Sequence, residues 1–217
     1  MSGSPVLGGA QTDALLAVLG DAQRLGFLGQ GPVERHIDHA LGFAGAWQRA
    51  RPGLRPASIA DLGSGGGVPG LVLAVATGAD LVLIDAKSRR TDWLAEAAWR
   101  LEVADRVTVL NRPAEEVGRD SSWRGSCEVV VARSFAGPAP TAECAAGLVA
   151  RGGLVVVSEP PEANTRWEGL VGSPLGFDEV ELVAASAGHY AVLLAGREPL
   201  EDRLPRTWAA QKKRPLW

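Results

Sequence analysis

The residues with the clearest chemical use form a glycine-rich stretch, DLGSGGG, over Asp61–Gly67. It follows a short apolar run at 58–62 that is typical of a strand, and it precedes a helical pattern over 69–77. Glycines at such a turn allow unusual backbone dihedrals and expose N–H groups at a helix N-terminus, so a ligand can approach the backbone closely. The sequence predicts a ligand-binding turn here. The alternative is a plain glycine-rich turn.

The spacing of this turn indicates which ligand it takes. Asp61 is followed by Gly63, Gly65 and Gly67, whereas a dinucleotide fingerprint spaces its glycines as G-x-G-x-x-G. No G-K-[ST] follows, which excludes a phosphate-cradling NTPase loop. The pattern acid-x-Gly-x-Gly-x-Gly resembles the first motif of class I methyltransferases, and that resemblance implies S-adenosylmethionine as the cofactor.

An acid ends the next predicted strand, DLVLID at 80–85. A carboxylate at the position of Asp85 can accept two hydrogen bonds from a ribose diol. The alternative role for Asp85 is to cap the helix that starts near Ser88. NAD(P)-dependent oxidoreductases use the same turn and acid, so they stay open as a second class. The only tyrosine, Tyr190, lacks a Tyr-x-x-x-Lys partner, but three histidines remain as proton donors: His36, His39 and His189.

The residues after the predicted fourth strand, 128–132, indicate the methyl acceptor. An Asn/Asp-Pro-Pro-aromatic turn for exocyclic amines is absent, and Ala132-Arg133-Ser134-Phe135 stands there instead. Cys127 and Cys144 are placed as buried small hydrophobes rather than as nucleophiles, and no carboxylate cluster for a metal can be assembled. The remaining acceptor is one that is nucleophilic when neutral. Guanine N7 is such an atom, and it needs orientation rather than a general base.

Several segments now occur in a distinctive order. They are GPVERHIDHALG at 31–42, DLGSGGGVPG at 61–70, LIDAKSRRTDWL at 83–94, RPAE at 112–115 and VVVARSFA at 129–136. This order resembles the bacterial ribosomal RNA small subunit methyltransferase G family, also called the glucose-inhibited division protein B family. The similarity covers roughly residues 25–158. It implies N7-methylation of a guanine in small-subunit ribosomal RNA.

The resemblance also implies roles for single residues. Arg133 would lie near the methyl group and the incoming base, and His36 matches the family's histidine in the helix before the core. The alternatives are a surface salt bridge for Arg133 and a structural role for His36. Ala114 and Glu115 would lie beside the adenine. Asp85 would hold the ribose, and the turn would bind the cofactor through Asp61, Gly63, Ser64, Gly65 and Gly67.

The chain departs from the family pattern at three places: Asp38-His39, Ser158-Glu159-Pro160 and the tail LPRTWAAQKKRPLW. A small-molecule methyltransferase and a cofactor-binding module without catalysis therefore stay open beside the ribosomal RNA enzyme.

The charges are unevenly distributed. The chain carries −3 overall, yet residues 197–217 hold six basic and three acidic residues. With Trp208 and Trp217, this tail is predicted to hold RNA by charge and stacking, the alternative being a solvated terminus. The predicted RNA-binding residues are Arg203, Arg206, Lys212, Lys213 and Arg214.

Elements that position these residues alternate along the chain. Further strands are predicted at 106–110, at 154–158 after a Gly152-Gly153 turn, and in a closing antiparallel pair, 179–184 and 190–194. Helices are predicted at 11–20, 33–51, 89–103 and 141–150. This alternation predicts an α/β, Rossmann-like fold with a seven-stranded, mostly parallel sheet. The resemblance implies that it is a class I methyltransferase. We predict three parts: an N-terminal helical appendage (1–52), the methyltransferase domain (53–200) and a basic C-terminal tail (201–217).

Composition agrees with a globular protein, with 46% hydrophobic and 22% charged residues. No apolar run reaches the ~18 residues of a membrane span, and the first residues lack a signal-peptide pattern. We expect a cytoplasmic protein that acts on ribosomal RNA or the ribosomal subunit, with no membrane or metal partner.

Overall fold

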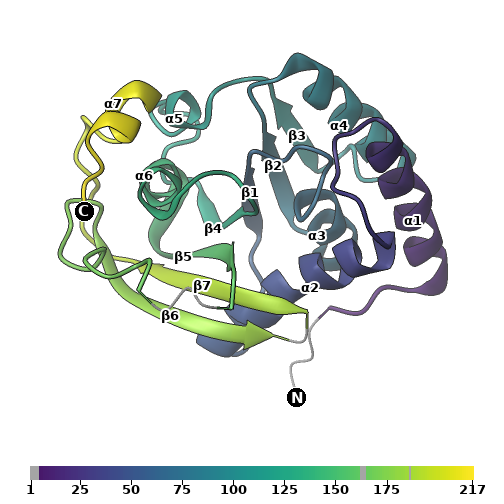
Figure 1. Ribbon diagram of the computed structural model, residues 1–217, viewed down its shortest axis with the longest axis horizontal. Helices are drawn as coiled ribbons and strands as arrows, with labels where there is room; N and C mark the ends of the chain where they lie inside the picture. Colours follow the sequence, from purple (N-terminus) through teal and green to yellow (C-terminus); the bar gives the residue numbers. More distant parts are fainter. Residues whose placement is uncertain (1–4, 162–164, 186) are drawn as a thin grey trace.

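A computed structural model describes residues 5–161, 165–185 and 187–217. The described residues form one seven-stranded sheet with the strand order β3-β2-β1-β4-β5-β7-β6 (Figure 1). The strands are β1 (Ser58–Leu62), β2 (Asp80–Ile84), β3 (Val107–Leu110), β4 (Cys127–Ala132), β5 (Val149–Glu159), β6 (Phe177–Ala185) and β7 (Gly188–Ala195). The first five run parallel, and β7 pairs antiparallel with both β5 and β6. The predicted sheet and its closing antiparallel pair are confirmed.

Helices cover both faces of this sheet (Figure 1). They are α1 (Gly9–Arg24), α2 (Val33–Ala50), α3 (Gly70–Thr77), α4 (Ser88–Arg100), α5 (Ala114–Val117), α6 (Pro138–Leu148) and α7 (Trp208–Lys213). Buried residues of α1 to α4 form one apolar cluster with one face of the sheet, whereas α5 and α6 pack on the other face. A sheet buried on both sides explains why its central strands are continuously apolar.

The N-terminal helices share the core of the sheet. Leu15 and Leu19 of α1 and Phe43 and Trp47 of α2 are buried in the same cluster as Val131 of β4. The apolar residues whose spacing predicted these helices are therefore the ones that pack against the sheet. The boundaries at residues 52 and 200 stay predictions.

Two local predictions are wrong. The helix expected at 141–150 begins at Pro138 and ends at Leu148, because proline is tolerated in the first turn of a helix. Gly152-Gly153 lies inside β5 rather than before it. A Cβ on Gly153 would lie 2.7 Å from the Glu128 carbonyl oxygen, so glycine is needed there for close approach of β4 and β5.

Strand order reverses at β1, which lies between β2 and β4. In open α/β sheets the crevice for ligands forms beyond the carboxyl ends of the strands at this reversal. Leu62 and Ala132 are paired at those ends. The glycine turn, which follows Leu62, and Arg133, which follows Ala132, therefore lie side by side at this edge of the sheet.

Candidate functional site

A cavity of about 420 Å³ lies at this reversal point, beyond the ends of β1, β2 and β4. Its walls come from five segments that are distant in sequence, and they include both charged and aromatic side chains. The lining residues are Gly63, Ile84, Asp85, Ala86, Lys87, Arg90, Arg112, Pro113, Ala114, Glu115, Ser134, Phe135 and Trp208. Four residues predicted to bind the cofactor are among them: Gly63, Asp85, Ala114 and Glu115.

Asp85 connects the cavity to the glycine turn. Its Oδ2 accepts a hydrogen bond from the Gly65 backbone N–H at 3.1 Å and lies 3.3 Å from Arg90 Nη1. Its Oδ1 accepts from the Lys87 N–H at 2.9 Å, just before α4 begins. Asp85 thus holds the backbone just before α4 and also lines the cavity, so its contact at the helix start leaves the predicted ribose contact open. A carboxylate oxygen accepts more than one hydrogen bond, which leaves capacity for a ligand hydroxyl.

The glycine turn takes the conformation that its sequence predicts. Gly63, Gly65 and Gly67 have φ values of +67°, +55° and +95°, which other residues rarely adopt. Ser64 Oγ accepts from the Ile84 N–H and donates to the Asp61 carbonyl, so it ties the turn to β2. Of these residues only Gly63 lines the cavity; Ser64, Gly65 and Gly67 shape the turn that bounds it.

Asp61 is buried below the turn and does not line the cavity. Its Oδ2 accepts from the Gly70 N–H at 3.0 Å, at the start of α3. Burial raises the pKa of Asp61 to about 7, against the lowering effects of that hydrogen bond, Ser64 and the Arg133 charge. Asp61 therefore holds the first residue of α3 in place through this hydrogen bond.

Arg133 and His36 meet on the face of the sheet that α2 covers. Arg133 Nη2 donates a hydrogen bond to His36 Nδ1 at 2.9 Å, across 97 positions of sequence. Side chains alternate along β4, which places Arg133 on the same face as Val131 and, through strand pairing, as Asp61. The two residues predicted for catalysis are thus in direct contact, outside the lining of the cavity.

Both ring nitrogens of His36 are engaged. Nε2 lies 3.0 Å from the Gly29 carbonyl, which can only accept, so Nε2 carries the proton and Nδ1 accepts from Arg133. Burial lowers the pKa of His36; the Gly29 hydrogen bond opposes this shift and the Arg133 charge adds to it. A neutral imidazole with both nitrogens occupied cannot act as a general base. It can hold the Arg133 guanidinium in place.

His39 lies one helical turn further along α2. It packs against Phe43 and Tyr190, with ring centroids 5.7 Å and 5.4 Å away. Burial lowers its pKa to about 4, with the charges of Arg133 and His36 adding to the effect. The departure from the family pattern at this position therefore lies within an aromatic cluster behind Arg133.

The basic tail is packed on the protein for part of its length. Arg206 binds the buried Glu143 carboxylate through Nε at 2.8 Å and Nη2 at 2.6 Å, and its backbone N–H donates to the same group at 2.7 Å. Arg203 pairs with Glu201 at the surface. Three predicted RNA-binding residues remain exposed without an ion pair within the described chain: Lys212, Lys213 and Arg214.

Glu159, the last residue of β5 and one of the positions where the chain departs from the family pattern, has a partner. It forms an ion pair with Arg166, and its side chain is 3% exposed. Burial raises the pKa of Glu159, and Arg166 opposes that shift. Its negative charge is therefore offset within the protein.

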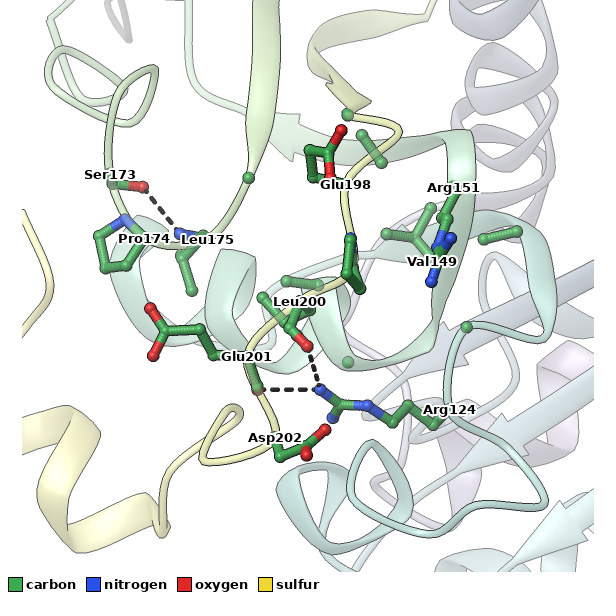
Figure 2. Close-up of a pocket in the computed structure, with 18 residues that line it drawn as sticks. Arg124, Val149, Arg151, Ser173, Pro174, Leu175, Glu198, Leu200, Glu201 and Asp202 are labelled. Carbon is green, nitrogen blue, oxygen red and sulfur yellow. Dashed lines mark hydrogen bonds between the residues drawn. The ribbon is translucent and has the colours of Figure 1, made fainter.

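A cavity of about 550 Å³ lies at the opposite end of the sheet, near the start of β5 and the end of β7 (Figure 2). Arg124 donates there to the carbonyls of Leu200 and Glu201, both at 2.9 Å, and thereby fixes the chain that leads into the tail. None of the residues predicted to bind the cofactor or to catalyse transfer lines it. Elsewhere in the described residues, no cluster of three potential metal ligands occurs, and no helix has the length and apolarity to cross a membrane.

Comparison with known proteins identifies relatives across this region. The family model GidB, described as rRNA small subunit methyltransferase G, matches residues 31–168. A ribosomal RNA small subunit methyltransferase G from Roseiflexus sp. (strain RS-1) is 30% identical, over 86% of this chain and 80% of the relative. The one from Synechococcus sp. (strain WH7803) is 29% identical, and the match covers 74% of this chain and 66% of the relative, just under two thirds of its length. An O-methyltransferase from Bacillus cereus, solved in complex with SAH, has the same fold, with a TM-score of 0.58 at 14% identity over 84% of this chain and 90% of that chain.

Proposed function

Because this chain belongs to the rRNA small subunit methyltransferase G family, we propose that it transfers a methyl group from S-adenosylmethionine to N7 of a guanine in small-subunit ribosomal RNA. The observation that carries the proposal is the arrangement at the ends of β1 and β4. A cavity with an acid at the end of β2 lies on one side, and an oriented guanidinium lies on the other. The proposed place of action is the cytoplasm, where ribosomal subunits occur.

The cavity fits an adenosyl ligand by the chemistry of its walls. Asp85 offers carboxylate oxygens to a ribose diol, and Ile84, Pro113 and Ala114 offer apolar surface to a purine. Gly63 has no Cβ; an added one would lie 2.7 Å from Phe135 Cδ2 and would push that ring. When bound, the cofactor supplies an electrophilic methyl group on a sulfonium. The remaining task of the chain is to hold the acceptor in line with it.

Arg133 and His36 serve the acceptor side in this proposal. Guanine N7 is nucleophilic when neutral, so the site needs no base, which agrees with a His36 whose two nitrogens are engaged. Arg133 is a planar donor that can stack on a base or hold a flanking phosphate. We assign Arg133 to orientation of the acceptor and His36 to positioning of Arg133.

The test is methyl transfer from labelled S-adenosylmethionine to small-subunit ribosomal RNA, free and in assembled subunits, with the product located by nuclease digestion and mass spectrometry. We expect 7-methylguanosine at one site, and none with the Asp85→Ala variant at the same cofactor concentration. Transfer to a small molecule alone would support the small-molecule enzyme. Cofactor binding without transfer to any acceptor would support a binding module, and NADH binding without S-adenosylmethionine binding would support an oxidoreductase.

A further inference from the structure

An aromatic pair forms one wall of the cofactor cavity. Phe135 follows β4 and Trp208 begins α7, and both side chains line the cavity. Their ring centroids are 5.7 Å apart at an interplanar angle of 67°, an edge-to-face contact. Phe135 lies directly over Gly63, since a Cβ there would come within 2.7 Å of the ring. The tail therefore reaches the glycine turn through Phe135.

The position of Trp208 is fixed by the protein itself. Two residues before it, Arg206 is held by the Glu143 carboxylate of α6, which is 2% exposed. Three residues after it, the buried Gln211 donates from Nε2 to the Arg206 carbonyl at 2.8 Å and accepts from Cys144 Sγ at 3.5 Å. In Figure 1, α7 lies beside α5 and α6. These contacts hold the Trp208 ring at the cavity, which reduces the ordering cost of binding.

The chemistry of the cavity is divided between its walls. Asp85, Lys87 and Arg90 bring charge at the start of α4, whereas Phe135 and Trp208 bring aromatic surface. An adenosyl group has the same division, with ribose hydroxyls and a planar purine. Aromatic side chains bind bases by stacking, at about 1–3 kcal/mol per base. Stacking needs no hydrogen-bond pattern, so it adds to contacts made by the backbone.

We propose that Trp208, supported by Phe135, is a cofactor-binding residue that takes the purine ring of the adenosyl group, so that α7 is part of the cofactor site. This inference rests on the proposed function, because it uses the same cavity. It gives the tail a role other than a flexible RNA-binding arm. It also gives a role to the buried Arg206–Glu143 ion pair, which anchors the segment just before α7.

The test is isothermal titration of the full-length protein with S-adenosylhomocysteine and, separately, with adenosine. Trp208→Ala is expected to raise both dissociation constants about tenfold, the effect of removing one aromatic ring on which a base stacks. Trp208→Phe keeps an aromatic face and is expected to stay within about threefold of the unchanged protein. An equal loss for the two ligands would assign the contact to the adenosine part that they share.

The matched control is Trp217→Ala. Trp217 is also a half-buried tail tryptophan with a ring partner, since it stacks on Trp167 at 6.4 Å, but it does not line the cavity. We expect its affinities to be unchanged. If Trp208→Ala binds adenosine as tightly as the unchanged protein, or if Trp217→Ala loses as much affinity, the inference is overturned.

Fluorescence gives a second readout that does not depend on the alanine variant folding. Adenosine should quench tryptophan emission of the unchanged protein, and Trp208→Phe should lose most of that quenching while it keeps its affinity. Quenching that persists in Trp208→Phe would contradict a contact at Trp208. Failure of the unchanged protein to bind S-adenosylhomocysteine would instead contradict the proposed function, so the two failures are distinguishable.

Discussion

Two buried carboxylates, Asp85 and Glu143, differ in what surrounds them. Asp85 accepts hydrogen bonds from two backbone N–H groups and faces the cavity, with Arg90 at its side. Glu143 is 2% exposed and is bound by the Arg206 guanidinium and backbone N–H. The first carboxylate retains capacity for a ligand, whereas the second is satisfied by the protein. The difference shows that a buried charge marks a binding site only where its hydrogen-bonding capacity opens on a cavity.

The largest expected effect is on stability, at Glu143. Arg206→Ala leaves that carboxylate buried without a guanidinium partner, held only by the backbone N–H, and should lower the free energy of unfolding by about 3–5 kcal/mol. The control is Arg203→Ala, because the Arg203–Glu201 pair is exposed and screened by solvent, so its loss is expected to change stability little. Urea denaturation of the three proteins measures this. Equal losses in the two variants would show that the buried pair contributes no more to the free energy of unfolding than the exposed pair does.

The next effect is on binding, at Asp85. Asp85→Ala should weaken S-adenosylhomocysteine binding by on the order of 2–4 kcal/mol, through loss of charge-assisted bonds to the ligand and to the turn. Asp80→Ala removes an exposed carboxylate at the other end of β2 and should leave the affinity unchanged. Calorimetry of both variants decides the matter. If Asp85→Ala binds as tightly as Asp80→Ala, the Asp85 carboxylate does not bind the ligand.

The smallest effect is expected from the exposed end of the tail. Replacing both Lys212 and Lys213 by alanine should weaken RNA binding and lower the slope of log affinity against log salt by roughly 0.7 to 0.9 for each phosphate that the variant no longer binds. Arg55→Ala, which removes an exposed cation before β1 at the opposite end of the sheet, is the control. Filter binding of small-subunit ribosomal RNA at several salt concentrations measures the slope. An unchanged slope in the double variant would show that Lys212 and Lys213 do not bind RNA phosphates.

Sequence reasoning succeeds where geometry is local. The glycine turn requires positive φ at Gly63, Gly65 and Gly67, and such a constraint is written in residue type and spacing. The parallel strands are predictable for a similar reason, since burial on both faces makes them continuously apolar. The position of Asp85 beside the glycine turn could be predicted in the same way, because it directly follows β2.

Other features depend on partners far away in the sequence. Arg206 carries a charge that suggests RNA, but its direction is set by Glu143, 63 positions earlier. Helices α5 and α7 have four and six residues, too few to show a helical period. The sequence predicts Trp208 as an RNA-stacking residue, and only the anchor of α7 on α6 shows that it lines the cavity. The sequence signal that points to Trp208 is an aromatic residue close to several cationic ones.

The central claim is that the two sides of β1 and β4 divide the work, with the cofactor held on the Asp85 side and the acceptor oriented by Arg133. The most direct measurement pairs the rate of methyl transfer at saturating cofactor with the dissociation constant of S-adenosylhomocysteine, for the Arg133→Ala protein. The account predicts a rate about a hundredfold lower, as for a misplaced reactant, with an affinity within about threefold of the unchanged protein. An affinity that falls a hundredfold, with the rate restored once the cofactor saturates, would place Arg133 on the cofactor and contradict the division.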